Sequence, residues 1–228
     1  MSSHHDWPVR RITGILGILV FVGIAVTLGL TASLPSSPDG PIEDVRELLA
    51  NDGGWVHASN WILAVTVVFL FLPFAAGLRS LLAKKDVDGG MWTRTAYGSA
   101  VGMAAVAMAG SIFVASTLLA FEPGSFDDAF LRMIAYADFY ISSVVISFFI
   151  GLFLAATSIV VLRTGALWKW LGWIGLLIAL IGLIGAWWPA TGNLGALAFI
   201  GYLSIPLFAV WSLFAGINLL RKPAAASE

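Results

Sequence analysis

Residues whose side chains could bind a polar ligand or carry a proton gather at one predicted depth of this chain. They come from two stretches, "VHASNW" and "RMIAYADFY", and from the serines that follow the second stretch. Together they offer a cation, a carboxylate, an imidazole, an amide, phenols and hydroxyls, the groups that fix a ligand in a mainly apolar pocket. These candidate polar residues are His57, Asn60, Arg132, Tyr136, Asp138, Tyr140, Ser143 and Ser147.

The spacing of the second stretch limits which side chains can meet. On one helix, the six positions between Arg132 and Asp138 mean a rise of about 9 Å and an offset of roughly 120°, so the two side chains do not touch. At 100° per residue, five residues share an arc of about 80° and form a polar stripe. Its serines either bond a neighbouring helix or line a ligand cleft. The stripe consists of Arg132, Tyr136, Tyr140, Ser143 and Ser147.

The first stretch is predicted to lie at the depth of the second. His57 and Asn60 begin one span, Asp138 lies at the boundary of another, and Arg46 lies in the loop above them. A carboxylate drawn into low dielectric needs a proton or a cationic partner. Two readings stay open, namely two solvated helix ends that never touch, and one polar cluster that binds a ligand.

The chain lacks the residues that most kinds of catalytic site require. The chain has no cysteine and three histidines, and no HExxH motif, which excludes thiolate metal sites and common zinc sites. The stretch "DVDGG" at 86–90 begins like a calcium loop but lacks the closing glutamate, and we interpret it as a turn. A net charge of -1 without a basic tail excludes nucleic-acid binding. We predict no enzyme activity, catalytic residue, metal or cofactor.

The elements that position these residues are membrane spans. Hydrophobic residues make up 59% of the chain and charged residues 11%, and the apolar residues form windows of about 20 residues. We therefore predict an all-α, polytopic membrane helix bundle with one domain over residues 1–228. The six predicted spans are 12–32, 57–79, 95–120, 138–162, 170–188 and 196–220.

Lysine and arginine predict the orientation, because cytoplasmic loops hold the excess of positive charge. In a six-span zigzag, Arg46 and Arg132 alone fall on the side that holds most carboxylates. Both termini are therefore expected in the cytoplasm, with the protein in the inner membrane. The basic residues on the opposite side are Arg10, Arg11, Arg79, Lys84, Lys85, Arg94, Arg163, Lys169, Arg221 and Lys222.

The longest external loop, 33–56, contains a predicted amphipathic helix at about 41–51. Glu43 and Asp44 favour a helix N-terminus, and apolar residues recur at helical spacing. Small residues predict which spans pack inside the bundle, with a homodimer through the same faces as the alternative. These small faces are Gly98, Gly102, Ala105 and Ala109 in the third span, and Gly175, Ala179, Gly182 and Ala186 in the fifth.

Two longer stretches, 47–82 and 151–186 with its hinge "RTGALWKWLGW", resemble the bacterial family known as domain of unknown function 4386. The resemblance implies a small six-span protein of the inner membrane and carries no catalytic residue across. From this resemblance and from the residues themselves, we expect a non-enzymatic protein that packs with lipid or with subunits of a membrane complex. The alternative is a carrier for a lipid or small molecule, with an outward-facing cleft lined by the candidate polar residues.

Overall fold

The computed structural model describes residues 3–31, 41–47, 50, 53–86, 88–120, 126–187 and 196–221. All its elements are helical, and two of them, η2 and η3, are short π-helical segments inside longer helices. In order they are α1 (Ser3–Thr31), α2 (Ile42–Glu47), α3 (Gly53–Val65), η2 (Thr66–Phe71), α4 (Leu72–Ala83), α5 (Met91–Ala120), α6 (Asp128–Phe139), η3 (Tyr140–Val145), α7 (Ile146–Thr164), α8 (Lys169–Ala186) and α9 (Ala196–Arg221).

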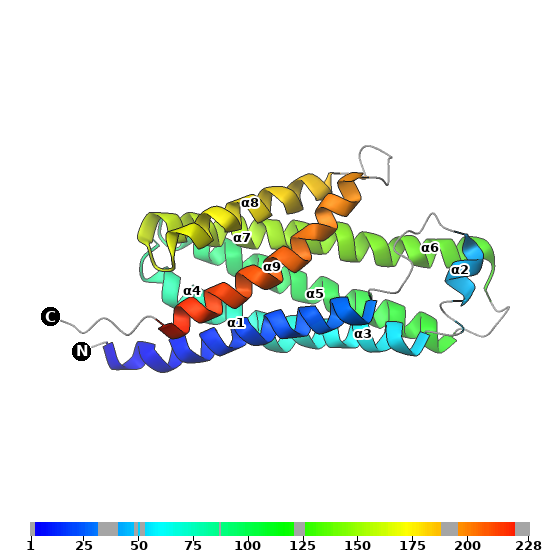
Figure 1. Cartoon of the computed structure of the whole chain (residues 1–228), viewed down its shortest axis with the longest axis horizontal. Coiled ribbons are helices and arrows are strands. Elements are labelled where there is room, and N and C mark those ends of the chain that lie inside the picture. Colours follow the sequence, from blue (N-terminus) through cyan, green and yellow to red (C-terminus); the bar gives the residue numbers. More distant parts are fainter. Residues whose placement is uncertain are drawn as a thin grey trace.

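The six-span prediction is confirmed, because six helical stretches are long and apolar enough to cross a bilayer. They run up and down, so that α1 begins and α9 ends at the same end of the bundle (Figure 1). We call this the terminal end and the opposite one the distal end. The stretches are Trp7–Thr31, Ala58–Ala83, Met91–Thr117, Ile146–Thr164, Lys169–Ala186 and Ile200–Arg221.

The second span, α3–η2–α4, contains a π-helical segment next to a proline. Pro73 stands at the start of α4, directly after η2 ends at Phe71. Proline has no N–H to donate and its ring clashes with the carbonyl one turn back. A wider turn before Pro73 relieves that clash while the helix continues.

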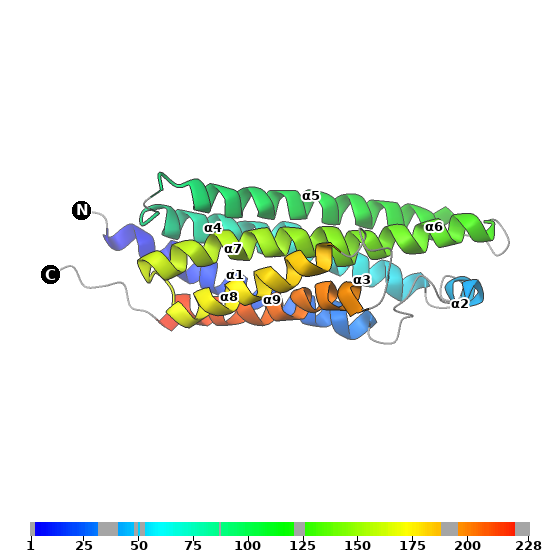
Figure 2. The same cartoon turned by 90° about the horizontal axis from the view of Figure 1, so that it is seen from above.

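The fourth span is one continuous helix through α6, η3 and α7, and it starts ten residues before the predicted boundary at 138. Asp127 caps it, because its side chain accepts a hydrogen bond of 2.8 Å from the Phe130 N–H. At the other end Gly165 has φ of 61°, and its N–H donates to the Val161 carbonyl. The helix therefore projects past the apolar window at the distal end (Figure 2).

Aromatic rings fill the middle of the bundle. Phe71 of η2, Phe153 of α7 and Phe208 of α9 meet edge to face, with ring centroids 5.1 to 6.0 Å apart. Trp211 of α9 packs beside them, and its indole N–H donates to the Leu171 carbonyl of α8 at 2.9 Å. Since lipid is as apolar as these rings, their close contacts and bonds, more than hydrophobicity, hold the helices together.

Small residues bring α8 and α9 close to their neighbours, as predicted for α8. A Cβ at Gly182 of α8 would lie 2.7 Å from the Ser147 carbonyl oxygen of α7. The predicted face of α5 is divided, because a Cβ at Gly102 would lie 2.5 Å from the Phe149 ring of α7, whereas Gly98, Ala105 and Ala109 are exposed on the outside of the bundle. The Gly–Ala spacing showed a face suited to close packing, but it could not show whether that face meets this chain.

Candidate functional site at the distal end

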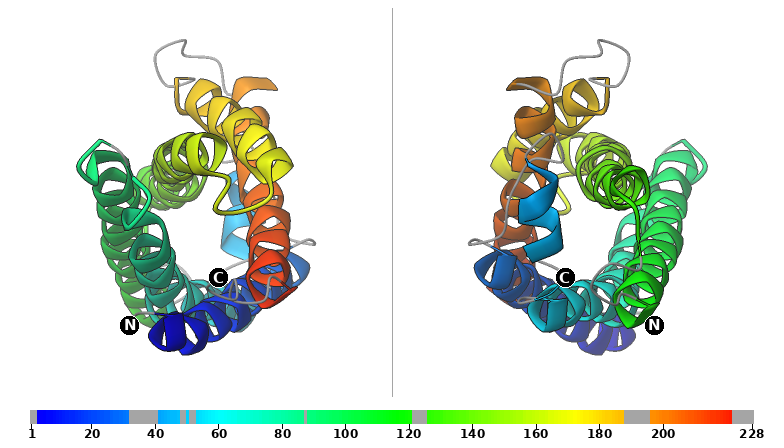
Figure 3. Two further views of the ribbon diagram at one scale, coloured as in Figure 1. Left: turned by 90° about the vertical axis from the view of Figure 1, so that its left-hand side faces the viewer. Right: turned by 90° about the vertical axis from the view of Figure 1, so that its right-hand side faces the viewer.

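The candidate polar residues lie on two helices that are both packed against α5. His57 and Asn60 lie on α3, and the other six lie along α6, η3 and α7. α5 contacts α3, α6 and η3, and the end-on views show it between α3 and α6 (Figure 3). The Ser111 hydroxyl of α5 donates to the Asn60 carbonyl at 3.2 Å. The side chains of His57, Asp138 and Ser143 lie outside the described part of the structure.

Ser147, at the inner end of the polar stripe, bonds two other helical residues. It is fully buried, donates to the Gly201 carbonyl of α9 at 2.9 Å, and accepts from the Ser204 hydroxyl at 3.1 Å. These bonds join α7 to α9. The arrangement is the helix-bonding use of a membrane serine, which was one of the two readings of the stripe.

The stripe is also interrupted. Our arc assumed an α-helix throughout, and this assumption is wrong because η3 occupies Tyr140–Val145. A π-helical turn takes up more residues than an α-helical turn, so the residues on its two sides are rotated relative to one another. Tyr140 is accordingly 36% exposed whereas Ser147 is 0% exposed. Arg132 and Tyr136 are partly buried on α6.

A helix forms within the predicted stretch, over Ile42–Glu47, and this helix, α2, packs against α6 (Figure 1). Residues 48–49 and 51 of the predicted helix lie outside the described part. Arg46 donates a hydrogen bond of 2.6 Å to the Asp128 carboxylate and one of 3.2 Å to the Phe126 carbonyl. Sequence reasoning placed Arg46 near Asp138 and missed Asp128 as its partner, although Asp127 and Asp128 carry the signal of a helix start.

Replacing Asp128 with Asn is expected to cost less than about 1 kcal/mol of folding free energy, the value typical of exposed ion pairs. The Asp128 side chain is 65% exposed and that of Arg46 is 34% exposed. Asp138→Asn is expected to lower the stability further, because a carboxylate at the hydrocarbon boundary needs a partner. Thermal unfolding of both variants in the same detergent checks this, and equal small losses would contradict it.

Polar side chains inside the described spans mainly donate hydrogen bonds to backbone carbonyls. Thr13 donates to the Val9 carbonyl and Ser99 to the Phe149 carbonyl, each at 2.7 Å. Ser158 and Asn218 are the buried side chains with no hydrogen-bond partner among the described residues. No Asp, Glu, Lys, Arg or His whose burial is described is buried. The described interior therefore offers no charged group for proton transfer.

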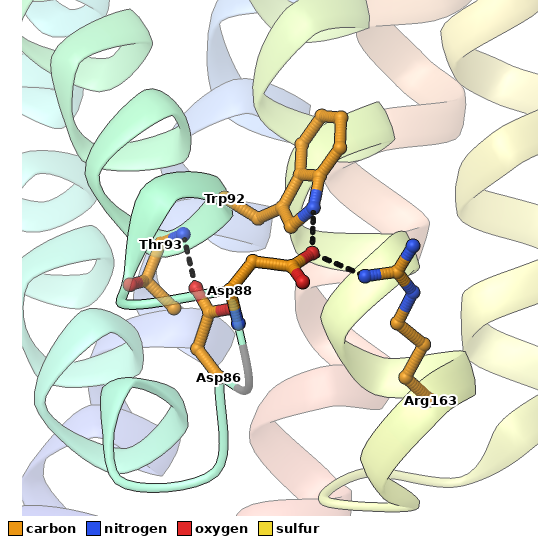
Figure 4. Close-up of polar contacts among 5 residues, drawn as sticks. All are labelled: Asp86, Asp88, Trp92, Thr93 and Arg163. Atoms are coloured by element: carbon orange, nitrogen blue, oxygen red, sulfur yellow. Dashed lines mark hydrogen bonds and ion pairs between the residues drawn. The ribbon is translucent and has the colours of Figure 1, made fainter.

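At the terminal end, residues 88–90 of the "DVDGG" stretch lie in a turn, as the sequence predicted, with Gly89 and Gly90 at positive φ. The Asp86 carboxylate accepts from the Thr93 N–H at 3.0 Å and so caps the start of α5 (Figure 4). The Asp88 carboxylate accepts from the Trp92 indole at 2.7 Å and pairs with Arg163 of α7 (Figure 4).

Asp86 thus holds the turn to the start of α5, and Asp88 fastens it to α7. Across the residues that the structure describes, no group of three metal-ligating side chains comes together. Comparisons of the chain with family models, with curated proteins and with solved structures give no match. The resemblance to the bacterial family of six-span proteins therefore stays a prediction.

Proposed function

We propose that this multi-pass protein is a non-enzymatic accessory component of the bacterial inner membrane, which packs a partner subunit's transmembrane helix against α5. The observation that carries the proposal is the outward position of Gly98, Ala105 and Ala109. A Cβ at Gly98 would meet no atom within 4 Å. Helices in lipid associate through small residues that allow close backbone approach.

The matching pattern on α8 supports this use of α5. Gly175, Ala179 and Gly182 are all buried against other helices, and a Cβ at Gly175 would lie 2.2 Å from the Ser158 hydroxyl. The chain thus uses the α8 face for its own packing and presents Gly98, Ala105 and Ala109 of the α5 face outside. The fourth residue of the α5 face, Gly102, packs against Phe149 of α7. An exposed face that only met lipid would have no need of glycine, which weakens a helix interior by about 0.5–1 kcal/mol relative to alanine.

Charge placement supports the non-enzymatic role and the orientation. The described aspartate, glutamate, lysine and arginine side chains lie near helix ends or in connections, away from the aromatic centre of the bundle. The basic residues predicted to face the cytoplasm, apart from Lys222, belong to the terminal ends of their helices or to the connections there. An excess of lysine and arginine marks the cytoplasmic side of inner-membrane proteins.

Cross-linking from α5 tests the proposal. A photoreactive residue at position 105 should give one discrete product in native membranes, and Gly98→Leu with Ala109→Leu should abolish it. The matched control is Ala25→Leu with Gly29→Leu on α1, where both positions are exposed and a Cβ at Gly29 meets no atom within 4 Å. This control should leave the product unchanged, and both double variants should keep the wild-type melting temperature.

Three outcomes would overturn the proposal. Absence of a product shows that α5 faces lipid only. A product at twice the mass of the 24.2 kDa chain replaces the partner subunit with a second copy. A stoichiometric small molecule that copurifies and is released by Tyr140→Ala, with no cross-link from position 105, favours the carrier function. That function has support from η3, because π-helical segments often occur at functional sites.

A further inference from the structure

The outer helix α6 carries apolar residues on two sides. Leu131 and Ile134 are buried, whereas Phe130 and Met133 are 38% and 51% exposed. A surface helix in water normally places its apolar residues on the one stripe that faces the core. On α5, which contacts α6, Leu119 is 83% exposed. We call Leu119, Phe130 and Met133 the distal apolar residues.

The exposed face of α6 lies too far out for lipid to cover it. The apolar span of the same helix, Ile146–Thr164, has 19 residues, and its length of about 28 Å matches the hydrocarbon core. Met133 comes 13 residues before Ile146, about 20 Å further along the axis, whereas the headgroup layer adds only about 5–7 Å on each side. Figure 2 shows α6 at the distal end of the molecule. Phe130 and Met133 therefore face water.

Carboxylates outnumber basic groups around this part of α6. The short helix α2 packs against α6, and residues 41–47 and 126–134 together carry five carboxylates and two guanidinium groups, a net charge of -3. A symmetric contact with a second copy would bring two such negative surfaces together, and like charges oppose that contact. The five carboxylates belong to Glu43, Asp44, Glu47, Asp127 and Asp128, all of which are exposed.

We propose that the distal apolar residues bind a basic amphipathic helix of another protein, outside the membrane. Its apolar stripe packs on Phe130 and Met133, and its lysine or arginine side chains lie beside the carboxylates of α2 and of the start of α6. Exposed apolar residues rimmed by polar ones mark protein contacts, and phenylalanine and methionine are enriched at the centre of such contacts. The surrounding negative charge selects a positively charged partner.

Site-specific cross-linking of the full chain in phosphatidylcholine nanodiscs tests this contact. A photoreactive residue replaces Ala129, which is exposed one turn before Met133. The probes are two synthetic helical peptides of about five turns with the same apolar face, one with lysine and one with glutamate on the polar face. The lysine peptide should give about tenfold more product than the glutamate peptide, and added salt should reduce that difference.

Two substitutions of exposed methionines separate this surface from the rest of the molecule. Met133→Arg removes an apolar anchor and sets a positive charge against a positive partner, and it should lower the yield with the lysine peptide about tenfold. Met91→Arg is the matched control, because Met91 is 50% exposed at the other end of the bundle, where α5 begins. This control should leave the yield unchanged, and both variants should keep the wild-type melting temperature.

Three results would overturn the inference. Equal products from the two peptides, or equal losses in Met133→Arg and Met91→Arg, would mean that neither the charge nor the outer side of α6 selects the partner. A product heavier by one phospholipid would show that lipid covers α6. A product at twice the mass of the 24.2 kDa chain would assign the contact to a second copy. Position 105 lies inside a span, so failure of the α5 cross-link leaves this contact standing.

Discussion

Trp211→Ala is expected to lower the free energy of unfolding by about 3–5 kcal/mol, the range for removing a large buried aromatic side chain. Trp211 is 1% exposed and packs against Phe153 and Phe208, with ring centroids 6.2 and 6.4 Å away. Removing it leaves a cavity at the centre of the bundle, where α7, α8 and α9 meet. The backbone of three packed helices cannot collapse to fill that space.

The measurement is unfolding in a mixed-micelle titration, followed by near-ultraviolet circular dichroism. Trp173→Ala is the matched control, because Trp173 on α8 is 67% exposed and should cost less than about 1 kcal/mol. Trp211→Phe separates packing from the bond to Leu171, and it should cost about 1 kcal/mol for the lost hydrogen bond plus a small cavity. Equal losses for Trp211→Ala and Trp173→Ala would contradict the assigned core.

The number and position of the spans followed from the sequence because the bilayer sets them. A span must form its backbone hydrogen bonds within one helix and must be long enough to cross about 30 Å of hydrocarbon. Both requirements produce long apolar windows that can be recognised in the sequence. The same rule explains the error at the fourth span. Hydropathy reports where lipid ends, whereas the helix continues to Asp128 because Asp127 caps it in the polar region.

Details that depend on neighbouring helices were beyond the sequence. Pro73 predicts a helix distortion, and η2 lies next to it. No proline lies in η3, so no residue there predicted its π-helical turn. Without that turn the polar stripe looked continuous from Arg132 to Ser147. The sequence also could not show whether a small-residue face points into the bundle or outward, because glycine and alanine suit both kinds of contact.

Ion pairs across the loops were the hardest to predict. Arg46 and Asp128 are 82 residues apart and meet because α2 packs against α6. In the sequence, Arg46 lies in a predicted external loop and Asp128 lies at a helix start, and no pattern links the two residues.

Gly216→Val should have the second large effect, separating α1 from α9. A Cβ at Gly216 would lie 2.5 Å from the Gly14 carbonyl oxygen and 3.1 Å from the Ile18 nitrogen, so the clash is with backbone and no rotamer relieves it. The Arg10 side chain donates a hydrogen bond of 3.0 Å to the Leu219 carbonyl beside this contact, and separation of α1 from α9 would lengthen that bond. Overpacking typically costs about 1–3 kcal/mol and occasionally more, and we expect the upper part of this range.

Gly29→Val is the matched control on α1, because a Cβ there meets no atom within 4 Å. Since valine suits a helix better than glycine does, this variant should be as stable as wild type or slightly more so. Both variants should be compared by the same micelle titration, with cross-linking between cysteines placed on α1 and α9 of the cysteine-free chain. Loss of the cross-link in Gly216→Val alone is the expected result. Equal stability of the two variants would mean that α1 and α9 are not in the backbone contact that Gly14 and Gly216 make in this structure.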